Sequence, residues 1–155
     1  GAFVTAWGSY GSGAGQFINP GDVATDTSGN VYVTDGANHV QKFDPGGTFL
    51  AMGGGGGTAN GQFDGARGLA TDAGGNVYVS DLYNHRIQKF TPDGEFISQF
   101  GSYGTGTRQL NRPSGVAVDP DGDVYVCDWA NHRVQIFDPD GKVITSLVGD
   151  AQELS

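Results

Sequence analysis

Long apolar runs and clusters of basic residues are both missing from this 155-residue chain. No stretch approaches the ~20 apolar residues of a membrane span, and the opening GAFVTAWGSYG lacks the basic-then-apolar layout of a signal peptide. We therefore expect a soluble chain with no membrane partner. Only 8 Lys and Arg residues accompany 17 Asp and Glu residues, which gives a formal charge of −9. Because nucleic-acid binding depends on clustered basic charge, we expect no nucleic-acid partner.

Cysteine is almost absent as well. The single residue, Cys127, excludes an internal disulfide and says nothing about the compartment, so the localisation stays open. It lies in the apolar run VYVCD. That setting predicts a buried structural thiol.

Glycine, by contrast, is abundant, and the sequence repeats itself. The 28 Gly and 6 Pro residues predict short elements joined by many turns. GNVYVTD at 29–35 returns as GNVYVSD at 75–81 and GDVYVCD at 122–128. The first copy continues NHVQKF where the others read NHRIQKF and NHRVQIF. We interpret this as one deletion that removes the counterpart of Arg86 and Arg133.

Each repeat contains four short runs with strand character. In the third repeat these are FISQF at 96–100, SGVAVD at 114–119, DVYVCD at 123–128 and RVQIF at 133–137. Four strands in a repeat of 40–50 residues are typical of a β-propeller blade. The sequence therefore predicts an all-β chain of three four-stranded blades.

The predicted organisation follows this repeat. A three-blade segment covers 1–149, and a C-terminal tail covers 150–155. Within the segment we place three repeats and one extra outer strand, at about 1–45, 46–92, 93–139 and 140–149.

The pattern GxFxxxWGxxGxGxGQFxxPxxVAxDxxGNVYVxDxxNHRIQKFxPDG resembles the NHL repeat. The resemblance implies propeller blades, but its members include interaction platforms, RNA binders, sensor domains and lyases. A closed ring of blades needs at least about four, and about six are common in this family. Three blades would leave two apolar faces open to water. We therefore expect the chain to be its own partner, with a homodimer completing six blades.

The three histidines occupy one repeated position and raise the question of a metal site. Equivalent positions in successive blades converge only at the propeller axis, and these histidines follow the second strand, away from it. We expect no metal and no cofactor, and we expect the Asp side chains to fix the following turn. The repeated motif comprises Asp35, Asn38, His39, Asp81, Asn84, His85, Asp128, Asn131 and His132.

A zinc enzyme is disfavoured by a second resemblance. Peptidyl-hydroxyglycine lyases, which are similar to NHL propellers, carry zinc-binding histidines in a Phe-x-x-Pro-His pattern. Gly21, Arg67 and Ser114 fill that histidine position in this chain. The run DPDGD at 119–123 lacks the downstream Glu of an EF-hand and is predicted to be a turn. No catalytic residue is predicted.

The remaining candidates lie on the loops. Tyr83 and Trp129 vary between copies while their neighbours do not, which is how a uniform scaffold acquires a ligand. The predicted binding residues on the loop face and channel rim are Gly21, Asp22, Arg67, Tyr83, Ser114 and Trp129. The run GGGGG at 53–57 predicts a flexible loop in which Gly53 replaces the counterpart of Trp7 and Phe100.

The sequence thus favours a non-catalytic binding or assembly module with a protein or small-molecule ligand on the loop face. Two alternatives stay open. The chain could be a fragment of a longer propeller enzyme, lyase or lactonase-like, or of a sensor whose active residues lie on other blades. It could also be a fragment engineered to study how propellers assemble.

Overall fold

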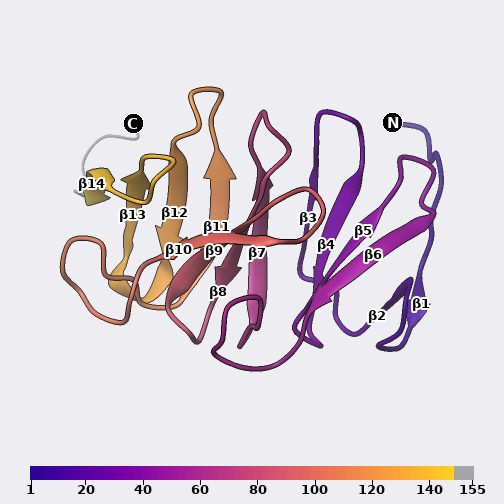
Figure 1. Ribbon diagram of the computed structural model, residues 1–155, viewed down its shortest axis with the longest axis horizontal. Helices are drawn as coiled ribbons and strands as arrows, with labels where there is room; N and C mark the ends of the chain where they lie inside the picture. The colour runs from indigo at the N-terminus through magenta and orange to yellow at the C-terminus, as the bar shows by residue number, and fades with distance from the viewer. Residues whose placement is uncertain (149–155) are drawn as a thin grey trace.

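The computed structural model describes residues 1–148. It contains three four-stranded antiparallel sheets and one two-stranded parallel sheet. The three larger sheets stand side by side as successive propeller blades, and β1 and β14 lie at opposite ends of the row (Figure 1). The predicted all-β architecture of four-stranded blades is confirmed. The predicted C-terminal tail, 150–155, lies outside the described residues.

The first blade is built as a meander in which each strand pairs with the next along the chain. The two-residue strands β1 (Ser9–Tyr10) and β2 (Gln16–Phe17) precede it. Alternating β-branched and aromatic residues form its strands, because such side chains pack well on a pleated surface. From the inner to the outer edge they are β3 (Asp22–Thr25), β4 (Val31–Asp35), β5 (His39–Phe43) and β6 (Phe49–Gly54).

The second and third blades repeat this order. The second contains β7 (Ala66–Thr71), β8 (Val77–Asp81), β9 (Arg86–Phe90) and β10 (Phe96–Phe100). The third contains β11 (Pro113–Val118), β12 (Val124–Asp128), β13 (Arg133–Phe137) and β14 (Val143–Val148). A three-residue 3-10 helix, η1 (Trp129–Asn131), separates β12 from β13. Within residues 1–148, no helix is long and apolar enough to cross a membrane.

The blade and the sequence repeat are offset by one strand. FISQF at 96–100 opens the third sequence repeat, yet it forms β10, the outer strand of the second blade. A tight turn brings it there, since Thr91 N–H donates to the Glu95 carbonyl oxygen at 2.8 Å. The long glycine-rich segments then lead to the next inner strand. The sheet therefore groups FISQF with the second blade, whereas the sequence repeat groups it with 114–137.

Aspartates order the turns between the first and second strands of each blade. The Asp119 carboxylate accepts N–H groups from Asp121 and Asp123, both at 3.0 Å. Asp26 and Asp72 accept the same pair of bonds in the other two blades. The DPDGD run is therefore a turn, as the sequence predicted.

The apolar core lies between the blades. One buried cluster joins the first and second blades through Tyr32, Leu69 and Val79, and another joins the second and third through Tyr78, Val124 and Val126. Each sheet has two apolar faces, so each junction buries one face from each neighbour. Burial at about 25 cal/mol per Å² makes these junctions the main source of stability.

Two predictions, a buried Cys127 and a flexible loop at Gly53, are wrong. Cys127 is exposed, whereas its counterparts Thr34 and Ser80 are fully buried. Thr34 and Ser80 face a following blade and donate hydrogen bonds to its first strand, at 2.7 and 2.8 Å. No blade follows Cys127 within the described residues. Gly53, expected in a flexible loop, instead lies in β6.

Candidate functional site

Asp81 is the centre of a buried polar network in the second blade. Its carboxylate accepts hydrogen bonds from the Asp64 backbone N–H at 2.8 Å, from the Asn84 amide at 3.0 Å, and from Arg86 Nε at 2.7 Å. Gln88 adds a fourth donor at 3.2 Å. The network ties the middle strands to the loop that precedes the blade.

The third blade builds the same network around Asp128. Asn131, Arg133 and Gln135 donate to its carboxylate, at 2.9, 2.7 and 3.2 Å. The Asn111 backbone N–H donates at 2.6 Å. Every donor has its counterpart in the second blade, so this constellation holds each of the two blades together.

The first blade departs from this arrangement. Strand register pairs Asp35 with His39, whereas it pairs Asp81 with Arg86 and Asp128 with Arg133. The deleted residue is therefore in the turn, and His39 holds the position of the arginines. Locating the deletion at the arginine itself was wrong, because strand pairing sets the register.

The turn residues show the same one-residue shift. The left-handed residue just before the third strand is Asn38 (φ 63°) in the first blade and His85 (φ 57°) or His132 (φ 54°) in the others. The Asn38 side chain then accepts the Gly65 backbone N–H at 2.7 Å, while Asn84 donates to Asp81. Aligned by their letters, Asn38 and Asn84 are equivalent; aligned by backbone, they are not. Among residues 1–148, no three His, Cys, Asp or Glu side chains are grouped to hold a metal ion.

Two of the predicted binding residues come together on the loop face. The Arg112 guanidinium carbon lies 5.8 Å from the ring of Tyr83 and 6.0 Å from the ring of Trp129. Tyr83 belongs to the second blade, and Arg112 and Trp129 belong to the third. Both rings are exposed, by 53% and 58%. We call Tyr83, Arg112 and Trp129 the aromatic–arginine cluster.

His85 supports this cluster from below. Its Nδ1 accepts the Arg112 backbone N–H at 3.1 Å, and its ring lies 4.8 Å from the ring of Tyr103. Burial and the nearby charge of Arg112 lower the pKa of His85 from its ordinary value. A lowered pKa keeps the imidazole neutral, which leaves Nδ1 free to accept this bond.

The other predicted residues lie at the starts of the inner strands. The backbone carbonyls of Arg67 and Ser114 accept the hydroxyl bonds from the preceding blade. Asp22 accepts the Leu69 backbone N–H at 2.9 Å, which links the first two inner strands. Gly21 is exposed, and its backbone N–H donates to the Thr34 carbonyl at 2.9 Å. These four residues therefore make contacts along the inner strands, and none of these contacts involves the aromatic–arginine cluster.

Arg112 is the residue that sequence reasoning missed. It looked like one of several scattered basic residues, and only its place before Pro113, where the other copies have Asn19 and Gly65, sets it apart. Tyr, Trp and Arg are the residues most enriched at binding hot spots. The cluster offers two exposed aromatic faces and a positive charge, which suits binding.

A family model for the NHL repeat matches the chain three times, at residues 17–43, 63–90 and 110–137. Each match covers the inner three strands of one blade. Among the curated proteins, none matches the sequence.

Solved structures share the fold at low sequence identity. Hydrazine synthase from Kuenenia stuttgartiensis is 15% identical, with a TM-score of 0.65 over 86% of this chain and 37% of its own. A nidogen/laminin complex is 21% identical, with a TM-score of 0.65 over 87% of this chain and 49% of its own. Virginiamycin B lyase from Staphylococcus aureus is 16% identical, with a TM-score of 0.63 over 86% of this chain and 42% of its own. The chain thus spans less than half of each of these structures, and the likeness concerns the fold alone.

Proposed function

Because the chain belongs to the NHL-repeat family, we propose that it is a non-catalytic binding and assembly module. Two copies pair to form a six-bladed ring, and the loop face of that ring binds a protein or small-molecule ligand. The single observation that carries the proposal is that both outer blades present an open face of the kind that is buried at the internal junctions.

The difference in exposure between equivalent residues of the outer blades and the middle blade supports this pairing. Val23 on the first blade is 60% exposed, whereas its counterpart Leu69 on the second is 4% exposed. On the third blade, Cys127 and Ala117 are exposed, whereas Ser80 and Ala70 are buried at the same positions of the second. A further blade on either side would cover these exposed side chains, as the second blade covers its neighbours.

The two open faces complement each other. The face of the third blade corresponds to the faces of the first and second that already pack on a following blade. The face of the first corresponds to those that receive a preceding blade.

A two-fold axis would bring both kinds of face together at once. Such a ring has two equal junctions and no open end. If each junction hides about 400 Å² of apolar surface, burial contributes on the order of 10 kcal/mol before the cost of association. The two junctions together contribute about 20 kcal/mol, against an association cost of about 4–15 kcal/mol and the net of about 8 kcal/mol that a micromolar Kd requires.

The N-terminal segment adds a constraint on closure. The ring of Trp7 lies 5.9 Å from that of Phe43, which resembles the contact of Phe100 with Phe137 across the internal junction. Trp7, at the end of residues 3–7, thus lies where a preceding blade presents the aromatic residue of its outer strand. In the ring, this segment and the partner's β14 compete for one edge, and one of them is displaced.

The loop face supplies the binding surface in this proposal. The aromatic–arginine cluster lies on loops that the blade network holds in place, so its rings are preorganised. Preorganised aromatic anchors lose little conformational entropy on binding. The ligand belongs to the class that stacks on aromatic rings and tolerates a neighbouring guanidinium.

The test is the mass in solution, measured by light scattering during size-exclusion chromatography. We expect about 32 kDa, twice the chain mass of 16.1 kDa. Val23→Asp places a charge on the open face of the first blade and should yield a folded monomer. Ile97→Asp is the matched control, because Ile97 is also exposed (45%) but lies on the outer strand of the covered middle blade.

A wild-type monomer with native-like far-UV circular dichroism would contradict the ring of two chains. It would favour the second candidate, in which these blades belong to a longer propeller enzyme, lyase or lactonase-like, or to a sensor. The comparison with virginiamycin B lyase is the observation that keeps this candidate open, since the chain spans 42% of that structure.

A further inference from the structure

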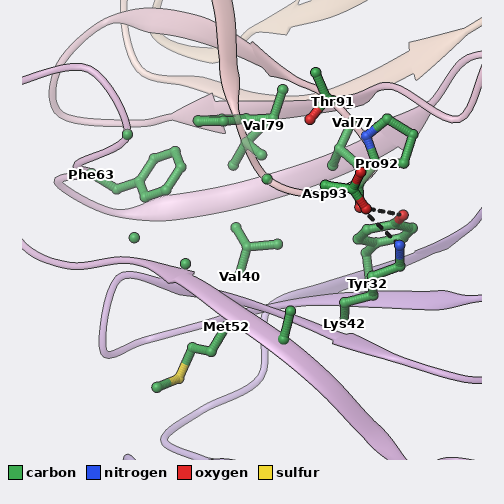
Figure 2. A pocket seen from close by; sticks show the side chains of 16 residues that line it. Tyr32, Val40, Lys42, Met52, Phe63, Val77, Val79, Thr91, Pro92 and Asp93 are labelled. Atoms are coloured by element: carbon green, nitrogen blue, oxygen red, sulfur yellow. Dashed lines mark hydrogen bonds between the residues drawn. The ribbon is translucent and has the colours of Figure 1, made fainter.

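The junction between the first and second blades contains a pocket of about 160 Å³. Figure 2 shows Phe63, Val77 and Val79 of the second blade on one side and Val40 of the first on the other. Polar groups gather at one end, where Lys42 Nζ donates to the Pro92 carbonyl at 2.8 Å. The rest of the lining is mainly apolar.

The pocket exists because one aromatic residue is missing from the repeat. In the second blade, Phe100 in the outer strand pairs with Ile87 and packs its ring 4.7 Å from Phe137 of the next blade. In the first blade, Gly53 takes the same register position, opposite Val40. Glycine has no side chain, so the space that a ring fills at one junction is vacant at the other.

The turn glycines give independent proof that a ring is missing. A Cβ built on Gly141 would lie 2.8 Å from Phe100, and one built on Gly47 would lie 2.8 Å from Trp7. A Cβ built on the equivalent Gly94 would have no atom within 4 Å. Gly94 and Gly53 both line this pocket, so the open space above Gly94 and the missing side chain at Gly53 belong to the same cavity.

We propose that this pocket binds a small neutral aromatic molecule, whose ring takes the place that Phe100 occupies at the next junction. The rings of Phe63 and Phe90, 5.9 Å apart, supply aromatic edges and faces for packing. A closed apolar cavity of about 150 Å³ in another protein takes up benzene. This pocket has a similar volume but opens to solvent beside Met52, which is exposed. The site is separate from the aromatic–arginine cluster and does not depend on ring closure.

The polar end selects among aromatic molecules. The Pro92 carbonyl oxygen accepts Lys42 Nζ at 2.8 Å and the Tyr32 hydroxyl at 3.5 Å, so an N–H or O–H of the ligand can replace the longer of these two bonds. Lys42 and the exposed Asp93 place opposite charges at this end, so it favours neither an anionic nor a cationic ring. Indole is therefore a suitable probe, because it is neutral and carries one N–H donor.

The first test titrates the full-length chain with indole by calorimetry and follows the melting temperature. We expect one molecule per chain, with a Kd on the order of 0.1–1 mM for a ligand of this size. Gly53→Phe restores the missing ring, so indole affinity should fall by about tenfold or more, and the melting temperature without ligand should rise. Unchanged indole binding by folded Gly53→Phe, or no binding to the wild type, would overturn the proposal.

A second variant creates the same vacancy at the other junction. In Phe100→Ala we expect two molecules of indole per chain, and indole should restore part of the lost melting temperature. One molecule per folded chain would refute the argument from the missing ring. Ile97→Ala, on the same strand but away from the junction, is the matched control and should bind as the wild type does. If Phe100→Ala does not fold, the wild-type and Gly53→Phe titrations still decide.

Discussion

Asp81 and Asp35 occupy the same place in two blades but have different partners. Asp81 accepts from Arg86, Asn84 and Gln88, and Arg86 is itself buried. Asp35 accepts backbone N–H groups from Ile18 and Ala37. Both residues are aspartates, so the difference between their contributions to stability comes from the buried arginine that only Asp81 has beside it.

We therefore expect Asp81→Ala to cost much more stability than Asp35→Ala. Removing one partner of a buried ion pair costs about 3–5 kcal/mol, because the remaining charge is left uncompensated. A fully buried donor that loses its acceptor costs about 1–3 kcal/mol. The Ile18 and Ala37 N–H groups are only part-buried and can bond water instead, so their cost is smaller. Urea denaturation of both variants measures the difference. Equal losses would contradict a special role for the arginine, and Asp81→Asn, which keeps the shape, should fall between them.

The lowered pKa of His85 predicts a dependence of stability on pH. Its folded-state pKa lies below the unfolded value because of burial and the charge of Arg112. Between the two values the unfolded chain binds more protons, so stability is full above about pH 6.5 and falls as pH drops towards the folded pKa. Below the folded pKa, this group causes no further loss.

His85→Asn isolates this effect, because Asn tolerates the left-handed backbone at this position (φ 57°). The variant should lose less stability than the wild type between about pH 7 and pH 5. Arg112→Ala should raise the pKa of His85, which an NMR titration of the ring C–H signal reports. A His85 pKa unchanged or lowered in Arg112→Ala would show that the guanidinium has no such influence.

At the scale of elements, the turns between third and outer strands form a matched set. Gly47, Gly94 and Gly141 share φ values of 87°, 86° and 78°. They differ in what lies above them, since only Gly94 has open space. Alanine at each position therefore separates backbone strain from contact with an aromatic ring.

We expect Gly94→Ala to cost about 1–2 kcal/mol, the ordinary strain of a left-handed residue. Gly141→Ala carries the same strain and also forces the Phe100 ring aside, which adds about 1–3 kcal/mol. Thermal and urea unfolding of the two variants give the difference directly. Losses of equal size would mean that the Phe100 ring moves freely, and this result would weaken the case for a ring-shaped vacancy at Gly94.

The sequence predicts the strands well and the contacts between blades poorly. The runs at 31–35, 77–81 and 124–128 alternate and recur, and both signals are local, so β4, β8 and β12 form where expected. The exposure of Cys127 and the pocket beside Gly53 depend on what the adjacent blade offers. No local pattern contains that information.

The candidate site shows the same limit. Tyr83 and Trp129 could be selected because they vary between copies, but Arg112 joins them only through a contact between blades. The letters NH align Asn38 with Asn84, whereas strand pairing aligns it with His85. The position of a one-residue deletion in a turn is determined by which residues pair across the two strands. That pairing cannot be read from the sequence alone.

At the scale of the whole molecule, a ring of two chains has a consequence for the one thiol. Cys127 holds the position of Thr34 and Ser80, whose side chains are fully buried against the next blade. In the ring, the first blade of the partner becomes that next blade. Cys127 would then pass from exposed to buried on pairing.

The rate of Cys127 modification by a water-soluble disulfide reagent should therefore depend on protein concentration. Above the dimer dissociation constant the thiol is covered and reacts slowly; on dilution below it, the rate should rise towards that of the monomer. Val23→Asp, which removes the open face that would cover the thiol, should react at the fast rate at every concentration, while Ile97→Asp should follow the wild type. The chain has no second cysteine to confuse the reading. A fast rate that stays constant with concentration would show that this face remains open, because burial by a second copy is a property of the pair and must disappear when the pair dissociates.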